Sequence, residues 1–82
     1  MITVYVAGPY TADPVACTAK AMDVADQIED AGLVAFIPHL SHFRHERRPR
    51  DYRYWMNVDL VWLRKCDAML RIPGYSPGAD EE

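Results

Sequence analysis

The segment 2–9, with the sequence ITVYVAGP, is an apolar run rich in β-branched residues that ends in Gly-Pro. Such a run, bounded by turn residues, is typical of a buried strand that leads into a turn. A second apolar run, 33–37 (LVAFI), is closed by Pro38, and a third, 68–72 (AMLRI), is followed by Pro-Gly. The sequence therefore predicts three short strands.

A helix is predicted between the first two strands. Asp13-Pro14 is a capping acid followed by proline at the first helical position. The apolar residues that follow recur at helical spacing from Cys17 to Ile28, with charged residues on the other faces. Gly32 stands just after this pattern, where the end of a helix favours a left-handed residue.

The segment between the second and third strands contains an irregular part and a helix. Residues 39–50 are polar and arginine-rich, and we expect them to form a long loop, which in a small domain is usually functional or disordered. Asp51 then predicts the cap of a helix that extends to about Lys65. After the third strand and a turn, residues 79–82 resemble the acidic first turn of another helix.

Strands that alternate with helices imply a parallel sheet with right-handed crossovers. The predicted fold class is α/β: a small three-layer, Rossmann-like domain over residues 1–82, with a short parallel sheet in the strand order 2-1-3. In such sheets ligands bind outside the carboxyl ends of the strands, where the strand order reverses. That point is flanked by Gly8-Pro9-Tyr10 and by 75–78 (YSPG), whose glycines allow a ligand to approach the backbone closely.

The composition excludes several classes of protein. Half of the residues are hydrophobic and 26% are charged, a balance that indicates a globular domain and not a disordered segment. The net charge of −3 argues against a general nucleic-acid binder, and no apolar run is long enough to span a membrane. Cys17 and Cys66 are too few for a disulfide framework, and they predict small buried thiols in a cytoplasmic protein.

Carboxylates are the first candidates for chemistry. Asp59 shares a helical face with Trp55 and Leu63, so it either reaches water or an arginine at the edge of that face, or is a cleft acid with a raised pKa. Glu81 and Glu82 are either favourable charges at a helix start or place a carboxylate within one turn of the binding loop. Two carboxylates in one crevice are the minimum equipment for glycosidic-bond cleavage, one as nucleophile and the other as acid and then base.

Other side chains have both structural and functional interpretations. His39, His42 and His45 recur every three residues, but Pro38 favours a loop there and no further ligand pattern accompanies them, so no metal site is predicted. Five arginines within ten positions form either a solvated surface or a clamp for phosphate: Arg44, Arg47, Arg48, Arg50 and Arg53. Four aromatic residues of the second helix are core residues, a stacking surface for a planar base, or an exposed patch that predicts a homo-oligomer, dimer or higher: Tyr52, Tyr54, Trp55 and Trp62.

Four segments, in order, resemble the nucleoside 2-deoxyribosyltransferase-like superfamily. The segment 4–10 (VYVAGPY) resembles that family's opening Y-x-A-G-P, and 31–38 resembles its glycine, apolar strand and proline. The segment 57–60 (NVDL), with 66–68 (CDA) behind it, resembles D-L followed by A/C-D, and 76–82 (SPGADEE) resembles S-x-G-(A/T)-x-x-E. The match covers nearly the whole chain.

The resemblance implies roles for single residues. Glu82 matches the glutamate that attacks the anomeric carbon and carries the sugar, Asp59 the acid that protonates the leaving base, and Tyr5 the tyrosine that orients the nucleophile. Ser76 resembles the phosphate-binding serine of nucleoside 5′-monophosphate N-glycosidases, and we expect Arg48 to bind the same group. The remaining matches surround the sugar: Gly8, Pro9, Tyr10, Gly78 and Ala79.

The predicted function is therefore that of a retaining N-glycosidase or 2-deoxyribosyltransferase acting, without a cofactor, on a nucleoside or its 5′-monophosphate. Members of the family continue past the nucleophile with the rest of a helix and a strand, and they complete the site with residues of a neighbouring subunit. We expect this chain to be a truncated version of that fold. A non-catalytic nucleotide-binding or interaction module of the same fold is the alternative.

Overall fold

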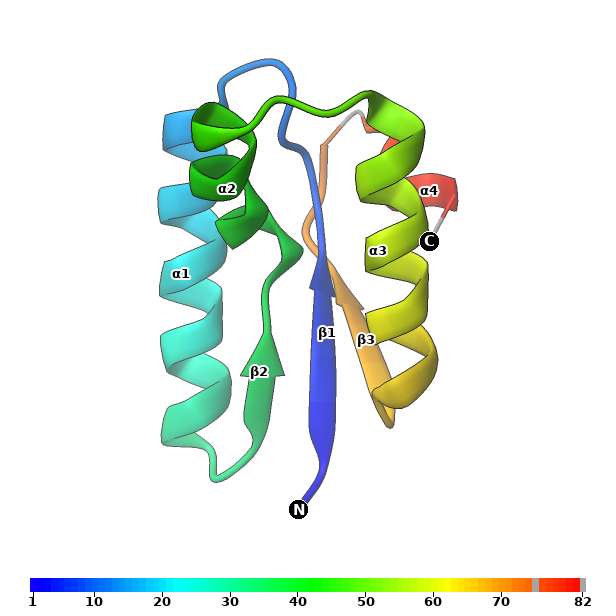
Figure 1. The fold of residues 1–82 in the computed structure, drawn as a ribbon. Helices are drawn as coiled ribbons and strands as arrows, with labels where there is room; N and C mark the ends of the chain where they lie inside the picture. The colour runs from blue at the N-terminus through cyan, green and yellow to red at the C-terminus, as the bar shows by residue number, and fades with distance from the viewer. Residues whose placement is uncertain (75, 82) are drawn as a thin grey trace.

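Strand β1 (Thr3–Ala7) is the centre of a three-stranded sheet, flanked by β2 (Val34–Phe36) and β3 (Ala68–Arg71). We analysed a computed structural model, which describes residues 1–74 and 76–81. Both strand pairs are parallel, and Val4 lies opposite Ala35 of β2 and Ala68 of β3. The strand order β2-β1-β3 (Figure 1) confirms the predicted parallel sheet and its order 2-1-3.

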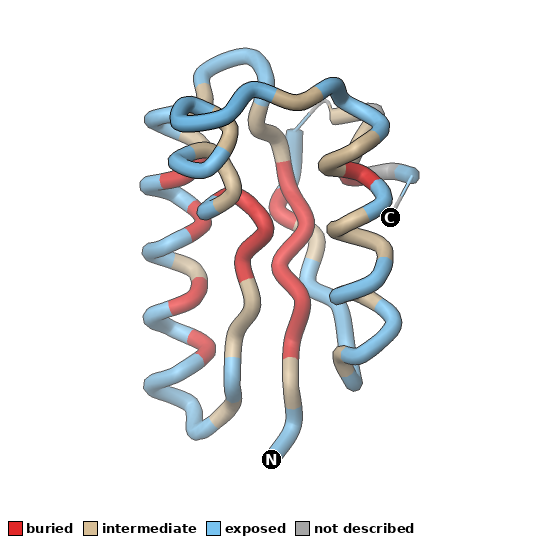
Figure 2. Tube along the Cα trace, viewed as in Figure 1, coloured by how far each residue is buried: buried red, intermediate tan, exposed pale blue. Residues whose placement is uncertain are grey.

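The alternation of side chains along β1 separates two cores. Val4 and Val6 pack with Ala21 and Ala25 of α1 (Pro14–Asp30) on one face of the sheet. Figure 2 shows the buried residues concentrated in β1 and along the inner side of α1. The side chains that α1 presents to the sheet include the alanines Ala21 and Ala25. Because these side chains are small, the helix can approach the sheet closely.

The opposite face of the sheet is covered by α3 (Tyr52–Lys65) and the short α4 (Pro77–Glu81). Tyr5 and Ala7 point to this side, where they form the second core with Ala79 of α4 and contact Leu63 of α3. Helix, sheet and helix thus form the three predicted layers in the part of the chain that the structure describes (Figure 1).

The capping signals in the sequence operate as predicted. Asp13 Oδ1 accepts the Ala16 backbone N–H at 3.1 Å at the start of α1, and Asp51 Oδ1 accepts that of Tyr54 at 2.8 Å at the start of α3. Gly32 adopts φ +87° after the end of α1, a conformation that glycine enters without the steric penalty of a Cβ.

The prediction of an irregular loop over residues 39–50 is wrong for most of that segment. A 3₁₀ turn, η1 (Pro38–Leu40), leads directly into α2 (Ser41–Arg47). Pro38 occupies the start of η1, where the missing N–H has no helical partner to lose. The i,i+4 pair of His42 and Glu46, 2.9 Å apart, supports α2.

Smaller differences concern the ends of elements and the cysteines. β1 begins at Thr3 and β3 ends at Arg71, one residue inside the predicted bounds, whereas α4 begins at Pro77, two residues before the predicted start. Cys17 and Cys66 are free thiols but are half-buried, not buried. None of the described helices is long and apolar enough to cross a membrane.

Candidate active site

A pocket of about 270 Å³ lies where the strand order reverses, beyond the carboxyl ends of β1 and β3. Its walls come from the loop after β1, from η1 and α2, from one side of α3, and from the start of α4. Six of the residues predicted for the site line this pocket: Gly8, Tyr10, Asp59, Ser76, Gly78 and Ala79. Three segments that are distant in the sequence therefore meet at one cavity.

The loops after β1 and β3 pack tightly against each other below the pocket. A Cβ on Gly8 would lie 2.9 Å from the Ile72 Cβ, so only glycine fits at this position. The Arg71 guanidinium donates hydrogen bonds to the carbonyl oxygens of Ile72 and Gly74, the second at 2.9 Å, and so holds the loop that follows β3. The loops below the pocket are therefore held by the close contact of Gly8 with the Ile72 side chain and by the Arg71 guanidinium.

The carboxylates of the site differ in their surroundings. Asp59 is half-buried on the side of α3 that faces the pocket. Glu81 forms a two-bond pair with the Arg53 guanidinium, at 2.8 and 3.2 Å, which connects α4 to the first turn of α3. Glu81 is thus engaged at the surface, and Glu82, the predicted nucleophile, lies outside the described residues, as does Tyr75 of the predicted binding loop.

Ser76 has a structural role in addition to its place on the pocket wall. Its Oγ accepts the backbone N–H of Ala79 at 3.2 Å, so the hydroxyl caps the first turn of α4. Ala79 is buried against Tyr5 and Ala7. The serine therefore stabilises the start of α4, the short helix that precedes the predicted nucleophile in the sequence.

Three predicted site residues are not part of the pocket wall. Tyr5 is fully buried beneath α4, with its ring stacked on Phe36 at a centroid distance of 5.8 Å. The Pro9 side chain lies against a smaller hollow beside α1, although its carbonyl oxygen accepts the His39 Nε2–H at 3.0 Å. Arg48 is exposed at the end of α2.

Sequence reasoning did not predict that two histidines would line the pocket. His45 Nδ1 accepts N–H groups from the Trp55 indole at 2.8 Å and from the Arg50 backbone at 3.2 Å, so the remaining ring proton is on Nε2. His39 is buried, and its Nε2–H donates to Pro9. The spacing of three between the histidines was the available signal, because on a helical segment it places them on neighbouring turns of one side.

The histidines do not form a metal centre with other side chains. Within residues 1–74 and 76–81 no three His, Cys, Asp or Glu side chains are grouped so that they could hold a metal ion. His39 Nε2, both ring nitrogens of His42 and His45 Nδ1 are hydrogen-bonded within the protein, to carbonyl, hydroxyl, carboxylate or N–H groups. The histidines instead connect the walls of the pocket.

The pH dependence of stability should reflect His39. Burial lowers the pKa of His39 below its usual value near 6.5, against the opposing effect of the Pro9 and Gly8 carbonyls. Below that usual value the unfolded chain takes up a proton that the folded protein does not bind. The free energy of unfolding should therefore decline as the pH falls from about 6.5 toward the folded-state pKa.

His39→Gln tests this expectation, because the amide can retain the hydrogen bond to Pro9 without titrating. We expect the variant to show a shallower loss of unfolding free energy between pH 7 and pH 5, measured by urea denaturation. An unchanged slope would show that His39 is not a source of the pH dependence. Asp67, whose pKa is lowered by hydrogen bonds from Thr3, titrates at lower pH and does not interfere in this window.

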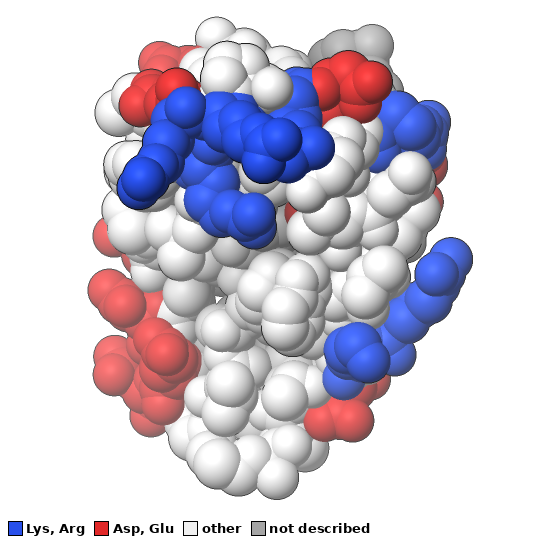
Figure 3. Space-filling model, in the orientation of Figure 1, with Lys and Arg blue, Asp and Glu red and all other residues white. Residues whose placement is uncertain are grey.

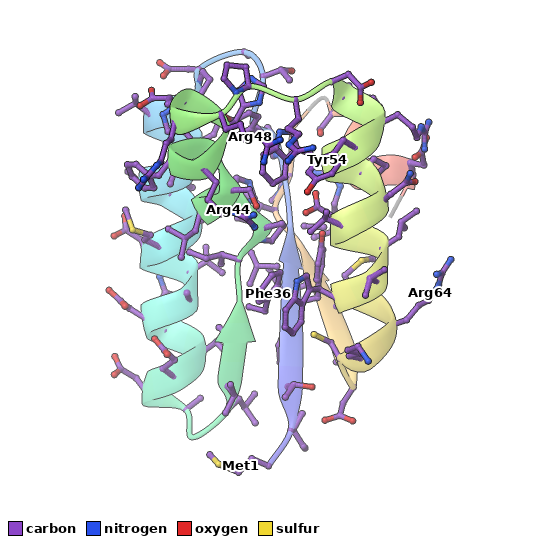
Figure 4. All side chains as sticks on the ribbon, viewed as in Figure 1. Met1, Phe36, Arg44, Arg48, Tyr54 and Arg64 are labelled. Atoms are coloured by element: carbon purple, nitrogen blue, oxygen red, sulfur yellow. The ribbon has the colours of Figure 1, made fainter. Side chains whose placement is uncertain are left out.

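Arginines and aromatic rings form the rim above the histidines. The Arg44 guanidinium lies 5.4 Å from the centre of the Trp55 ring, and that of Arg50 lies 4.3 Å from the Tyr54 ring. Figure 3 shows the basic side chains gathered at the upper end of the molecule, and Figure 4 places Arg44 and Arg48 at this end, near Tyr54. The rim is positively charged although the whole chain has a net charge of −3.

The predicted cluster of aromatic residues on α3 is divided between two places. Tyr52 and Trp55 line the pocket, whereas Trp62 lies near the other end of the helix and stacks on Phe36 with ring centres 5.1 Å apart. Tyr52 and Trp62 each expose about half of their surface. A planar ligand in the pocket thus has two aromatic side chains within reach.

Comparisons with known proteins leave the function to be argued from this pocket. No protein-family model, no curated protein and no solved structure matches the chain. The pocket residues, the polar groups beside them and the arginine rim are therefore the observations that bear on function.

Proposed function

We propose that this protein is a retaining N-glycosidase or 2-deoxyribosyltransferase with a Rossmann-like domain of the nucleoside 2-deoxyribosyltransferase-like kind. Its substrate is a deoxynucleoside or a deoxynucleoside 5′-monophosphate, and no cofactor takes part. The observation that carries the proposal is the meeting of residues 8–10, Asp59 and residues 76–79 at one pocket. These are the segments whose resemblance to the family implies binding and catalysis.

The proposed mechanism divides the work between two carboxylates. Glu82 attacks the anomeric carbon and forms a glutamyl-sugar ester, while Asp59 protonates the departing base. Water, or a second base, then attacks the ester and releases the sugar with its original configuration. Tyr5, buried next to Ala79, acts by holding α4 and the glutamate that follows it.

The size and the lining of the pocket suit both the base and the 5′-phosphate of such a substrate. Trp55 and Tyr52 place aromatic rings on the wall beside a planar base, and the volume of about 270 Å³ is close to the lower end, roughly 300 Å³, of small-molecule sites. The arginine rim and the Ser76 hydroxyl are donors suited to phosphate. A phosphorylated substrate is therefore favoured over the free nucleoside.

The direct test is the release of free base. We would incubate the chain with each deoxynucleoside and each monophosphate and quantify base by chromatography, with Glu82→Ala beside it. The proposal predicts base release that Glu82→Ala abolishes. Equal release by both proteins would exclude the covalent mechanism, and nucleotide binding without release would favour a non-catalytic binding module.

Arg48→Ala should distinguish phosphorylated from free substrates. If the arginine rim binds phosphate, the variant should raise the KM for the 5′-monophosphates by about tenfold, equivalent to the loss of one charge-assisted hydrogen bond of roughly 1.5 kcal/mol. The KM for free deoxynucleosides should not change. Lys20→Ala on α1, an exposed cation away from the rim, is the control, and equal effects on both substrate classes would contradict the assignment.

We also propose that the chain forms a homodimer through the uncharged face that contains Phe36 and Trp62. Figure 3 shows this face bordered by acidic side chains over α1 on one side and by basic side chains on the other, where Figure 4 places Arg64. In a two-fold dimer whose axis lies in this face and runs between its two charged borders, the acidic border of one copy lies opposite the basic border of the other. Such complementarity in the lower part of the face favours a second copy as the occupant.

Sedimentation velocity at increasing protein concentration tests the dimer. The unmodified chain should shift toward twice the monomer mass, and Trp62→Lys should remain monomeric because it places a charge in the apolar contact. Lys20→Ala serves as the surface control. A clean monomer at high concentration, or a dimer that Trp62→Lys does not weaken, would contradict this interface.

A further inference from the structure

One hydrogen-bonded chain leads from the pocket to the surface of the molecule. The Tyr10 hydroxyl lies 2.7 Å from His42 Nδ1, and His42 Nε2 lies 2.9 Å from Glu46 Oε1. Tyr10 belongs to the pocket wall, and the His42 side chain is 12% exposed, whereas that of Glu46 is 64% exposed. The three groups therefore join the cavity to solvent through a sheltered imidazole.

The direction of the hydrogen bonds follows from the chemistry of the partners. A carboxylate only accepts, so His42 Nε2 carries a proton and donates it to Glu46. In the neutral ring Nδ1 is then an acceptor, and the Tyr10 O–H donates to it. The lone pairs of the Tyr10 oxygen remain available to accept a proton from a molecule in the pocket.

His39 and His45 cannot serve as the imidazole that links a pocket hydroxyl to a carboxylate. His39 Nε2–H is bound to the Pro9 carbonyl, and His45 Nδ1 accepts two N–H groups. His42 is, among the described residues, the histidine that connects a hydroxyl of the pocket to a carboxylate. The arrangement repeats the order hydroxyl, imidazole, carboxylate that activates a hydroxyl group in hydrolytic enzymes.

Tyr10 is suited to pass a proton on and not to act as a stable anion. Burial, and then the negative charge of Glu46, raise the pKa of Tyr10 above its usual value of 10.0. A free phenolate is therefore disfavoured, and the hydroxyl can lose its proton to His42 only while it gains another from the pocket. Glu46 stabilises the imidazolium that this transfer forms.

We propose that Tyr10, His42 and Glu46 form a proton relay in which Tyr10 takes the proton of the molecule that attacks the sugar. This role rests on the proposed function, because it concerns the second half of that reaction. The water oxygen bonds to the anomeric carbon as the ester bond to the glutamate breaks and its electron pair returns to the carboxylate. One water proton moves to Tyr10, and the Tyr10 proton moves to His42 Nδ1. The imidazolium later releases a proton to solvent, and Asp59, ionised in the first half, takes one up from solvent.

The test separates the two halves of the reaction. Rapid-quench measurements with the deoxynucleoside 5′-monophosphates give the rate of base release in the first turnover and in later turnovers. Tyr10→Phe should keep the first turnover within about twofold and slow later turnovers by about 10²-fold or more, the usual contribution of a proton-transfer group. The sugar adduct should accumulate on the protein.

One further variant and one control complete the design. Glu46→Gln should slow the same later step by a smaller factor, because the amide can still accept from His42 but carries no charge. Glu29→Gln is the matched control, since Glu29 is an exposed acid of α1 outside the pocket wall, and it should behave as the unmodified chain. Equal slowing of both halves in Tyr10→Phe, or no slowing, would overturn the relay.

Failure of the proposed function would give a different result from failure of the relay. In that case the unmodified chain would release no base from any of these substrates. ¹⁵N NMR of the histidine rings then decides on the relay: a proton on His42 Nε2, with a Nδ1 resonance that Tyr10→Phe shifts, supports it. A proton on Nδ1 and none on Nε2 would overturn it.

Discussion

Asp59→Asn is expected to reduce the rate of base release by roughly 10²–10⁴-fold, the contribution typical of general acid catalysis. Purines and pyrimidines are poor leaving groups as anions, so protonation of the base lowers the barrier to cleavage. Asp59 is half-buried on the pocket wall, whereas the rim arginines that would hold the phosphate are not part of that wall, and the isosteric amide should preserve its packing. Binding of the monophosphate should therefore change little.

The measurement pairs chromatography of free base with calorimetric titration of a deoxynucleoside 5′-monophosphate. Asp26→Asn, an exposed acid of α1, is the matched control and should alter neither quantity. A loss of binding as large as the loss of rate would show that Asp59 binds the ground state instead of supplying a proton. An unchanged rate would remove Asp59 from the mechanism.

Tyr5→Ala should have the largest effect on stability, a loss of roughly 3–5 kcal/mol in the free energy of unfolding, as for other large aromatic side chains truncated in a core. Tyr5 is fully buried on the central strand, stacks on Phe36 and packs against Ala79 of α4. An 82-residue domain has a total stability of roughly 4–12 kcal/mol, so this one change could remove a large part of it.

Urea denaturation followed by circular dichroism measures this loss, and Val15→Ala, at a position 71% exposed, provides the small-effect control. If Tyr5→Ala does not fold at all, Tyr5→Phe keeps the ring and allows the catalytic role to be examined. A folded Tyr5→Phe with slower base release supports the positioning of the nucleophile by the hydroxyl. A loss below about 1 kcal/mol in Tyr5→Ala would contradict the packing described for the second core.

The sequence predicted the sheet and the two long helices because their signals are local. Apolar runs bounded by turn residues mark the three strands, although only the central β1 is buried along most of its length, whereas β2 and β3 are exposed or half-buried. Asp13 and Asp51 cap helices through side-chain contacts three residues away. The strand order also followed, because right-handed crossovers leave few arrangements for three parallel strands.

The segment 38–47 could not be predicted in the same way. Its polar composition and Pro38 indicate a loop, but α2 is held by contacts with distant residues, such as the Tyr10 hydroxyl on His42 and the Trp55 indole on His45. A helix of seven residues has little stability of its own, so tertiary contacts decide whether it forms. For the same reason the sequence indicated the glycine loops and Asp59 but not the histidine wall of the pocket.

The covalent intermediate is the central claim, and intact-mass spectrometry tests it most directly. The chain would be mixed with a deoxynucleoside 5′-monophosphate, quenched in acid within the first turnover, and then mapped by proteolysis. We predict a mass increase of one phosphorylated deoxyribosyl group, located on Glu82 and missing in Glu82→Ala. Release of base with no adduct, or with the adduct on another residue, would contradict the account.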